Sequence, residues 1–424
     1  MNLKSRKNIL SSKTKESNSI NFYKTDGTKL GMLEVSFMML VICIVGVFIG
    51  YIIGNKNIKT IKYVSPNKKL NEFIETYNYI LDNYYGVEEI TEDQILNSAI
   101  EGLLNSFGDP NTTYMTEVES NNFNIQLKGD YQGLGVEISN ELETGNIVIV
   151  SIFKDSPADK SGLKPGDMIL KIDDIDVSKK ESSYFSKYIS ESTNTTFNIL
   201  IKRENEEMNI IVNKENIVLK SVASKIFEKN NKKIGYIYLS IFAENSYSQF
   251  KSELENLEQK GIDSLILDLR SNTGGHLSSA HNILNLFLDS DKIVYKTEDK
   301  KGIETFYSNG NKDKKYKIVI LVNELTASSS EIVTAGLKEN LDSIVVGKTT
   351  YGKGTVQELR TISTGAQYKF TIKKWLTPKE NFIHGVGIKP DYEIDLDDNY
   401  IKNPTDENDN QLQKAIEILE EKSN

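Results

Sequence analysis

The apolar residues of this chain separate a polar tail and one long apolar run from a region where short apolar runs alternate with helical patterns. Residues 1–34 are polar, rich in lysine and without apolar periodicity, which predicts a disordered tail. Residues 35–53 are almost all apolar and carry no charge. A helix of about nineteen residues spans about 28 Å, close to the thickness of a bilayer core. The run therefore predicts one transmembrane helix.

This apolar run reads as an uncleaved signal anchor. A secretory signal would have a shorter apolar region and a small-residue cleavage site, and none follows here. A lipoprotein is the alternative suggested by Cys43, but Val41 and Ile42 precede that cysteine where a small residue would be needed. Lysines flank the run on both sides, so charge alone does not fix the orientation of the helix.

Residues 54–128 form a region with helical patterning. Apolar residues between 70 and 84 recur on one helical face, and Thr91 with Gln94 matches a capping box for a second helix. Asp109 and Pro110 are expected to end that helix. We predict no catalytic group in this region and assign it to packing, against the core or against a second copy of the chain in a homodimer.

Residues 129–217 carry the motifs of a small β domain. Gly133, Leu134, Gly135 and Val136 form a G-L-G-apolar loop, and the downstream sequence contains SPA, GL and PGD followed by an apolar strand at 168–172. Together these motifs resemble a PDZ domain. The resemblance implies that backbone N–H groups of the loop bind a peptide C-terminal carboxylate, with the peptide added as a strand. A β domain that serves only as a spacer is the alternative.

Residues 218–395 alternate between strand and helix patterns, which predicts an α/β core. The predicted strands include 234–241, 264–269, 318–322 and 343–346, and a helix is predicted over 247–260. In the last segment, 396–424, an acidic loop over 396–410 precedes an amphipathic helix over 411–421.

Candidate chemistry lies between the strand at 318–322 and a helical pattern that follows three serines. Ser328 with Glu331 fits a capping box, so a helix cap is the simplest use of the first serine. A hydroxyl at this turn also lies near free backbone N–H groups, which can stabilise an oxyanion. Further on, Lys353 stands between two glycines directly after a strand. A solvated turn charge is the alternative use of that lysine.

The sequences NELTASSSEI at 323–332 and YGKGTVQ at 351–357 resemble the C-terminal processing (tail-specific) peptidases, serine peptidases with a Ser–Lys dyad. The resemblance extends over about residues 70–421 and includes DLRSNTGG at 268–275 and FIHGVGIKPD at 382–391. It implies a core of the crotonase/ClpP-like type with an inserted PDZ domain, and an exported catalytic part on the extracytoplasmic side of the cell membrane.

Carried over position by position, the resemblance implies that Ser328 is the nucleophile, Lys353 the general base and Gln357 the residue that orients the lysine. It also implies that one of Gly274 and Gly275, together with Ser329, supplies the oxyanion-hole N–H groups. Serine needs a neighbouring base, and burial can lower a lysine pKa enough for it to act as one. Ser329 replaces the usual alanine and therefore stays an alternative nucleophile.

Composition narrows the remaining possibilities. The net charge of −9 disfavours a nucleic-acid partner, and the sequence has no nucleic-acid-binding motif. The three histidines, His276, His281 and His384, are too scattered to predict a metal site, and we expect no cofactor. A Ser-His-Asp triad is possible but unnecessary beside the lysine. His384 is expected to be a hydrogen-bonding residue rather than a catalyst.

Three functions are consistent with these motifs. The first is a membrane-anchored serine endopeptidase that recognises protein C-termini. The second is a non-catalytic PDZ adaptor on an inactive peptidase core, disfavoured because Ser328, Lys353 and Gln357 are all present. The third is a crotonase-like enzyme acting on thioesters, which would need neither a PDZ domain nor an anchor.

Overall fold

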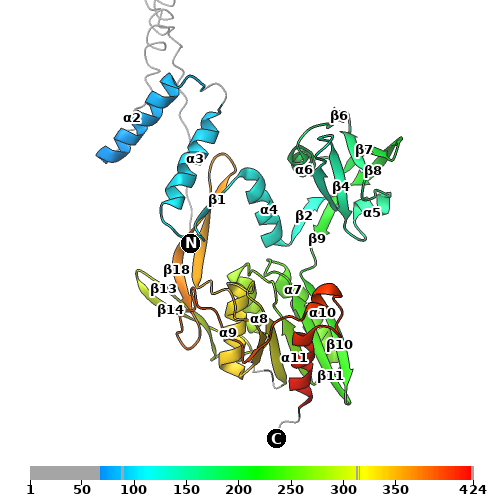
Figure 1. Cartoon of the computed structure of the whole chain (residues 1–424), viewed down its shortest axis with the longest axis vertical. Helices are drawn as coiled ribbons and strands as arrows, with labels where there is room; N and C mark the ends of the chain where they lie inside the picture. Colours follow the sequence, from blue (N-terminus) through cyan, green and yellow to red (C-terminus); the bar gives the residue numbers. More distant parts are fainter. Residues whose placement is uncertain (1–66, 87–89, 312–313, 315, 422–424) are drawn as a thin grey trace, which may run out of the picture. The chain divides into compact units, whose positions relative to one another are not determined.

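The computed structural model describes residues 67–86, 90–311, 314 and 316–421 (Figure 1). The predicted tail, 1–34, and the predicted transmembrane helix, 35–53, lie outside these residues. Among the residues described, no helix combines the length and apolar character needed to cross a bilayer. The chain divides into a first unit that ends at Ile90 and a second that begins at Thr91.

The described part of the first unit is essentially one helix, α2 (Lys68–Asn83), as the apolar periodicity predicts. Asn67 caps it by accepting the N–H of Lys69. None of its residues is buried, and Leu70 and Phe73 of the apolar stripe are 45% and 55% exposed. Within residues 67–86 and 90, the described part of this unit, no other element covers the stripe.

The second unit begins with two helices, each of which has a capping box at its N-terminus. Thr91 and Gln94 cap α3 (Glu92–Asn105), as predicted, and Thr116 and Glu119 cap α4 (Glu117–Lys128). Between the helices lies a short strand, β1 (Thr113–Met115). The region predicted as helical, 54–128, thus also contains a strand, which the pattern did not show because three residues are too few for strand periodicity.

A small β domain follows, built on a sheet in the order β3-β4-β5-β7-β8 with β6 beside β5. Its core contains Leu134, Ile149, Phe185 and Phe197, which are almost fully buried. The strands are β3 (Val136–Asn140), β4 (Ile147–Ile152), β5 (Met168–Ile172), β6 (Ile175–Asp176), β7 (Thr196–Arg203) and β8 (Glu206–Asn213). Its helices are α5 (Pro157–Ser161) and α6 (Ser182–Glu191).

The two chain connections of this domain run side by side. Strand β2 (Asp130–Gly133) enters it and pairs antiparallel with β9 (Glu215–Val218), which leaves it. Paired entry and exit strands are what an inserted domain requires.

The α/β core is organised on a six-stranded sheet in the order β10-β11-β12-β15-β16-β19. All neighbours are parallel except β10 and β11. The continuous apolar runs of β12 and β15 are buried almost throughout, as expected for strands covered on both faces. The strands are β10 (Val222–Lys229), β11 (Lys232–Leu239), β12 (Ser264–Asp268), β15 (Lys317–Val322), β16 (Ile344–Gly347) and β19 (Tyr392–Glu393).

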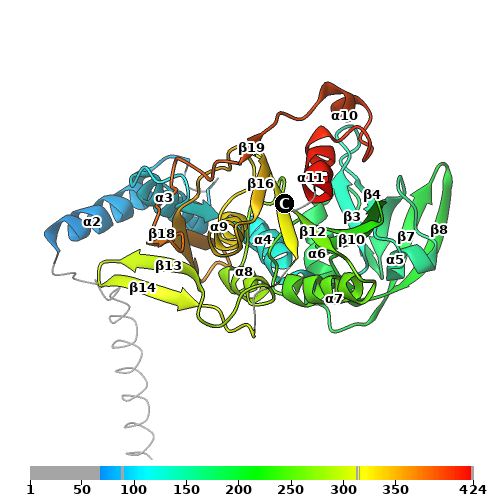
Figure 2. The ribbon, with the colours of Figure 1, turned by 90° about the horizontal axis from the view of Figure 1, so that it is seen from below.

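Helices cover both faces of this sheet. On one face α7 (Ser246–Gln259), α8 (Leu277–Leu284) and α9 (Ser329–Leu341) pack on alternate strand residues such as Leu267 and Ile320. On the other, α11 (Asn410–Glu420) packs on Ile266 and Val319 (Figure 2). A short helix, α10 (Asp398–Lys402), interrupts the segment predicted as a loop over 396–410.

A second sheet, which the sequence patterns do not predict, carries part of the candidate site. It runs in the order β1-β18-β13-β14, with β17 paired to β18. Its strands are β13 (Ile293–Asp299), β14 (Gly302–Tyr307), β17 (Thr355–Thr361) and β18 (Gln367–Leu376). Strand β1, from ahead of the β domain, therefore completes a sheet that belongs to residues far downstream.

Candidate active site

The turn between β15 and α9 holds Ser328 in a strained backbone conformation. Its φ of 56° and ψ of −118° fall in a region that residues other than glycine rarely occupy. Such strain persists where surrounding structure enforces it, and it is common at catalytic positions. In the predicted capping box, the Ser328 N–H donates to Glu331 Oε2 at 2.8 Å, and the Glu331 N–H donates at 2.9 Å to the carbonyl of Ser328.

The three consecutive serines differ in what their hydroxyls do. Ser329 is 1% exposed and donates to the Gly275 carbonyl at 3.0 Å. Ser330 is fully buried and donates to the Asn272 carbonyl at 2.9 Å. Only Ser328 is partly exposed. The fold thus uses two of the hydroxyls to bind the neighbouring glycine turn and leaves the first one at the surface.

The glycine turn after β12 packs directly against Ser328. A Cβ on Gly274 would lie 2.8 Å from the Ser328 Cβ, and a Cβ on Gly275 would lie 2.4 Å from the Phe242 carbonyl oxygen, so both positions need glycine. Both also have positive φ, 103° and 137°. The buried side chain of Asn272 accepts the Gly274 N–H at 2.9 Å.

Two N–H groups of this region therefore stay available. Gly274 is buried and its N–H is used, whereas Gly275 is exposed. Within the described part of the chain, no acceptor is recorded for the N–H of Gly275 or of Ser329, the first residue of α9. The positive end of the helix dipole lies at the same place.

Lys353 is held in a tight turn between β16 and β17. Its carbonyl accepts the Trp375 indole N–H at 2.7 Å, and its own N–H donates to Glu331. Gly352 allows close contact with the loop at 383–387, where an added Cβ would lie 2.7 Å from the Gly387 nitrogen. No hydrogen bond or ion pair of the Lys353 ammonium is recorded among the residues described here.

Burial is the main reason why the pKa of Lys353 falls from 10.5 to about 8. The positive charge of Lys369 lowers the pKa further, while the carboxylates of Asp109 and Glu331 oppose the change. An amine with this pKa is partly neutral at physiological pH and can accept a proton.

Glu331 ties the serine turn to the lysine turn. One carboxylate oxygen, Oε2, accepts the N–H groups of both Ser328 and Lys353 at 2.8 Å. The other, Oε1, accepts from Gly352 and from the Thr350 hydroxyl. Burial raises the pKa of Glu331, and these four hydrogen bonds partly offset that rise. The sequence marked Glu331 only as a cap, because its partners near residue 350 are distant in the chain.

Gln357 lies on β17, opposite Thr371 of β18. Its side-chain amide donates to the hydroxyls of Thr355 at 2.9 Å and Thr371 at 3.2 Å. No contact between this amide and the Lys353 ammonium is recorded among the described residues. The structure therefore orients Gln357 through threonines that sequence reasoning missed.

A buried network of ion pairs lies at the start of the glycine turn. Arg270 pairs with Asp268 at 2.6 Å and with Asp409 at 2.7 Å, and it also donates to Gln411. Asp409 caps α11 by accepting the N–H of Leu412. Burial lowers the pKa of Arg270, but the two carboxylates outweigh it and raise the pKa overall. The network therefore links the turn to the C-terminal helix.

The histidines lie in separate surroundings. His281 packs edge-on against Tyr295, and burial lowers its pKa. His384 is exposed and stacks on Phe382, so its ring makes an aromatic contact where we expected hydrogen bonding. Among the described residues, no group of three or more histidine, cysteine or acidic side chains could hold a metal ion.

The loop at 133–136 joins β2 to β3 in the β domain. Leu134 is buried in the domain core, and Gly135 has a φ of 81° and lies against Ser156. The carbonyls of Leu134 and Gly135 accept from Ala158 and Phe153. No acceptor is recorded within the described chain for the N–H groups of Leu134 and Gly135. The loop thus has donors of the kind that bind a carboxylate.

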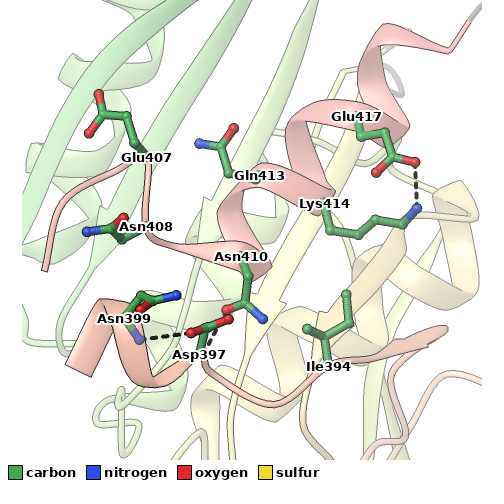
Figure 3. A pocket seen from close by; sticks show the side chains of 9 residues that line it. All are labelled: Ile394, Asp397, Asn399, Glu407, Asn408, Asn410, Gln413, Lys414 and Glu417. Carbon is green, nitrogen blue, oxygen red and sulfur yellow. Dashed lines mark hydrogen bonds and ion pairs between the residues drawn. The ribbon is translucent and has the colours of Figure 1, made fainter. Parts of the chain in front are cut away.

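A hollow of about 510 Å³ lies elsewhere, around the start of α11 (Figure 3). Some of the polar groups that line it are hydrogen-bonded to one another. The Asn399 N–H donates to Asp397, and the Lys414 ammonium donates to Glu417. The lining consists of Ile394, Asp397, Asn399, Glu407, Asn408, Asn410, Gln413, Lys414 and Glu417. Ser328 and Lys353 are not part of it, so the hollow is separate from the candidate site.

Comparison with known proteins gives a consistent classification. The family model for Peptidase family S41 matches residues 233–394, and that for the PDZ domain matches 132–213. The model "Activating protease CtpB N-terminal domain" matches 52–118.

Individual relatives agree with this. The "Probable CtpA-like serine protease" of Staphylococcus haemolyticus is 36% identical over 77% of this chain and 64% of its own length. That of Staphylococcus aureus is 32% identical over 83% of this chain and 72% of its own length. A crystal structure assigned to the S41 proteases of Bacteroides fragilis shares the fold, with a TM-score of 0.50 and 16% identity over 84% of this chain and 98% of that one.

The fold and the matches define the class as a serine peptidase with a mixed α/β core and a PDZ domain. Within that class, the chain belongs to the C-terminal processing peptidases of Peptidase family S41.

Proposed function

We propose that this chain is a membrane-anchored endopeptidase that recognises protein C-termini and cleaves peptide bonds with a Ser328–Lys353 dyad. The observation that carries the proposal is the difference in burial and hydrogen bonding among the three adjacent serines. Of the three serines, only Ser328 is partly exposed, and it lies in a strained turn beside two unused N–H groups, while the hydroxyls of Ser329 and Ser330 donate to backbone carbonyls. The lowered pKa of Lys353 supplies a base.

In the proposed reaction, Ser328 Oγ attacks the peptide carbonyl carbon while Lys353 Nζ takes the hydroxyl proton. The N–H groups of Gly275 and Ser329 stabilise the resulting oxyanion. The C–N bond then breaks, and the ammonium returns the proton to the leaving amine, which leaves an ester on Ser328. Water attacks this acyl-enzyme with Lys353 again as base, and the ester bond breaks to free the acid and the serine.

The test uses the full-length protein in detergent and fluorescein-labelled casein as a generic unfolded substrate. Ser328→Ala and Lys353→Arg should each abolish cleavage, since a guanidinium does not give up its proton. The matched control is Ser248→Ala, because Ser248 is an exposed serine of α7. This variant should cleave casein like the wild type. Full activity of Ser328→Ala with loss of activity in Ser329→Ala would assign the nucleophile to Ser329, and activity in every variant would refute the dyad. A wild-type protein that does not cleave casein would favour the non-catalytic adaptor.

The unused N–H groups at 134 and 135 support C-terminal recognition by the PDZ domain. A hydrogen bond from N–H to a charged group contributes about 1.5–3 kcal/mol, so amidating a peptide's C-terminus should weaken its binding at least about tenfold. Isothermal titration with the acid and amide forms of one peptide measures this. Equal affinities would exclude carboxylate recognition.

The anchor and its orientation rest on residues 35–53 and on the family resemblance. With the catalytic part outside the cell, protease added to intact protoplasts should digest residues 54–424 and leave the tail at 1–34 protected. Protection of the core together with digestion of the tail would reverse the topology. The exposed apolar stripe of α2 is compatible with a homodimer, which light scattering of the full-length protein measures.

A further inference from the structure

The chain ahead of the PDZ domain reaches the strands that carry Gln357. Strand β1 pairs antiparallel with β18, with Thr113 opposite Lys369. Just before β1, Asp109 and Thr112 lie beside Thr371 and are hydrogen-bonded to it. The sequence predicted no catalytic group in this segment, but the structure bonds the Asp109 carboxylate to a strand of the candidate site.

The Asp109 carboxylate collects three donors. The hydroxyls of Thr371 and Thr112 donate to Oδ2 at 2.6 and 2.7 Å, and the Asn111 N–H donates to Oδ1 at 2.9 Å. Burial raises the pKa of Asp109, but these hydrogen bonds outweigh it and lower the pKa overall. Asp109 is therefore ionised at neutral pH and can only accept.

The ionised Asp109 carboxylate determines the direction of the hydrogen bond between Thr371 and Gln357. A hydroxyl has one proton, and Thr371 gives it to Asp109, so the Thr371 oxygen can only accept in return. The side-chain N–H₂ of Gln357 donates to it at 3.2 Å and to Thr355 at 2.9 Å. Both amide hydrogens are then used, and only the carbonyl oxygen of Gln357 is left for a further donor.

We propose that Asp109 is a positioning residue of the peptidase site, which acts through Thr371 to leave the Gln357 carbonyl oxygen free to accept from the Lys353 amine. The inference rests on the proposed roles of Lys353 and Gln357. It makes the segment ahead of the PDZ domain a part of the catalytic machinery.

Asp109 also acts on Lys353 through its charge. The charged groups that act on Lys353 are Asp109, Glu331 of α9 and Lys369 of β18. The two carboxylates favour the protonated amine, and Lys369 disfavours it. Removing the Asp109 charge should therefore lower the pKa of Lys353.

The experiment measures kcat, KM and the pH profile for casein cleavage by the full-length protein. Asp109→Asn keeps the shape but removes the charge, and one of its two polar atoms becomes a donor. We expect kcat to fall about tenfold, the size of one lost hydrogen bond, with KM unchanged. The acidic limb of the profile should move to lower pH, an effect that partial misfolding would not produce.

A pair of variants at Thr371 separates the effect of orientation from the effect of charge. Thr371→Val should show the same loss of kcat without the shift in pH, because Asp109 keeps its charge, and Thr371→Ser should restore activity. The matched control is Thr361→Val, which removes the same kind of Gln–Thr hydrogen bond, to Gln367, on the same two strands. That variant should cleave like the wild type.

Wild-type kcat in Asp109→Asn, or a loss in Thr371→Val that Thr371→Ser does not restore, would overturn the inference. If Asp109→Asn does not fold, the Thr371 pair decides. Lys353→Arg is measured alongside. Activity in that variant would refute the dyad and this inference with it, whereas an inactive Lys353→Arg beside a wild-type Asp109→Asn would refute the inference alone.

Discussion

Peptidase activity should rise with pH through the titration of Lys353. Only the neutral amine can take the proton of Ser328, and the lysine has a pKa of about 8 instead of 10.5. At pH 7 this makes about one molecule in ten competent and raises the neutral fraction about 300-fold over an ordinary lysine. We expect kcat/KM to increase about tenfold per pH unit below 7 and to level off above about 9.

The variant Lys369→Met tests the cause of this pKa. The charge of Lys369 helps to lower the pKa of Lys353, so its removal should raise that pKa and move the acidic limb to higher pH. This shift is opposite in sign to the one expected for Asp109→Asn. The assay is the initial rate of casein cleavage at pH 5.5–10 with substrate well below KM. A wild-type profile that is flat between pH 6 and 9 would refute the neutral-lysine mechanism.

Three further predictions concern stability, measured by urea unfolding with the fluorescence of Trp375, the one tryptophan of the sequence. Lys353 binds its proton below pH 10.5 in the unfolded chain but only below about 8 in the folded protein, so the free energy of unfolding rises with pH between these values. Below pH 8 the folded protein is therefore destabilised by the buried, protonated lysine. Lys353→Met should remove this destabilisation and increase the free energy of unfolding by up to about 3 kcal/mol at pH 7. Unchanged stability would mean that Lys353 is not desolvated. Glu331→Gln places an N–H₂ group against backbone donors and should cost about 3–6 kcal/mol through two lost charged hydrogen bonds. A cost below about 1 kcal/mol would contradict the role of Glu331 as a clamp. Arg270→Met leaves two buried carboxylates unpaired and should cost about 3–5 kcal/mol, and a loss that vanishes in the double variant with Asp409→Asn would assign it to that pair.

The sequence by itself determined the main strands of the core sheet, the helix caps and the order of the motifs. Continuous apolar runs such as 318–322 predicted buried strands, since a parallel strand covered on both faces needs apolar residues at every position. Local rules also located the capping boxes at Thr91 and Ser328, because their partners lie three residues away. The membership in the C-terminal processing peptidases followed from ordered motifs and is confirmed by the comparisons.

Only the tertiary structure decided what each polar group at the site does. Three adjacent serines are alike in sequence, but two of their hydroxyls are used by carbonyls more than fifty residues away. Gly274 and Gly275 are alike too, until Asn272 uses the N–H of the first. The hydrogen bonds of Glu331 with the turn at 350–353 and of Asp109 with Thr371 join segments 19 to 262 residues apart. A local pattern cannot encode such pairs, because they exist only after the two sheets bring distant strand ends together.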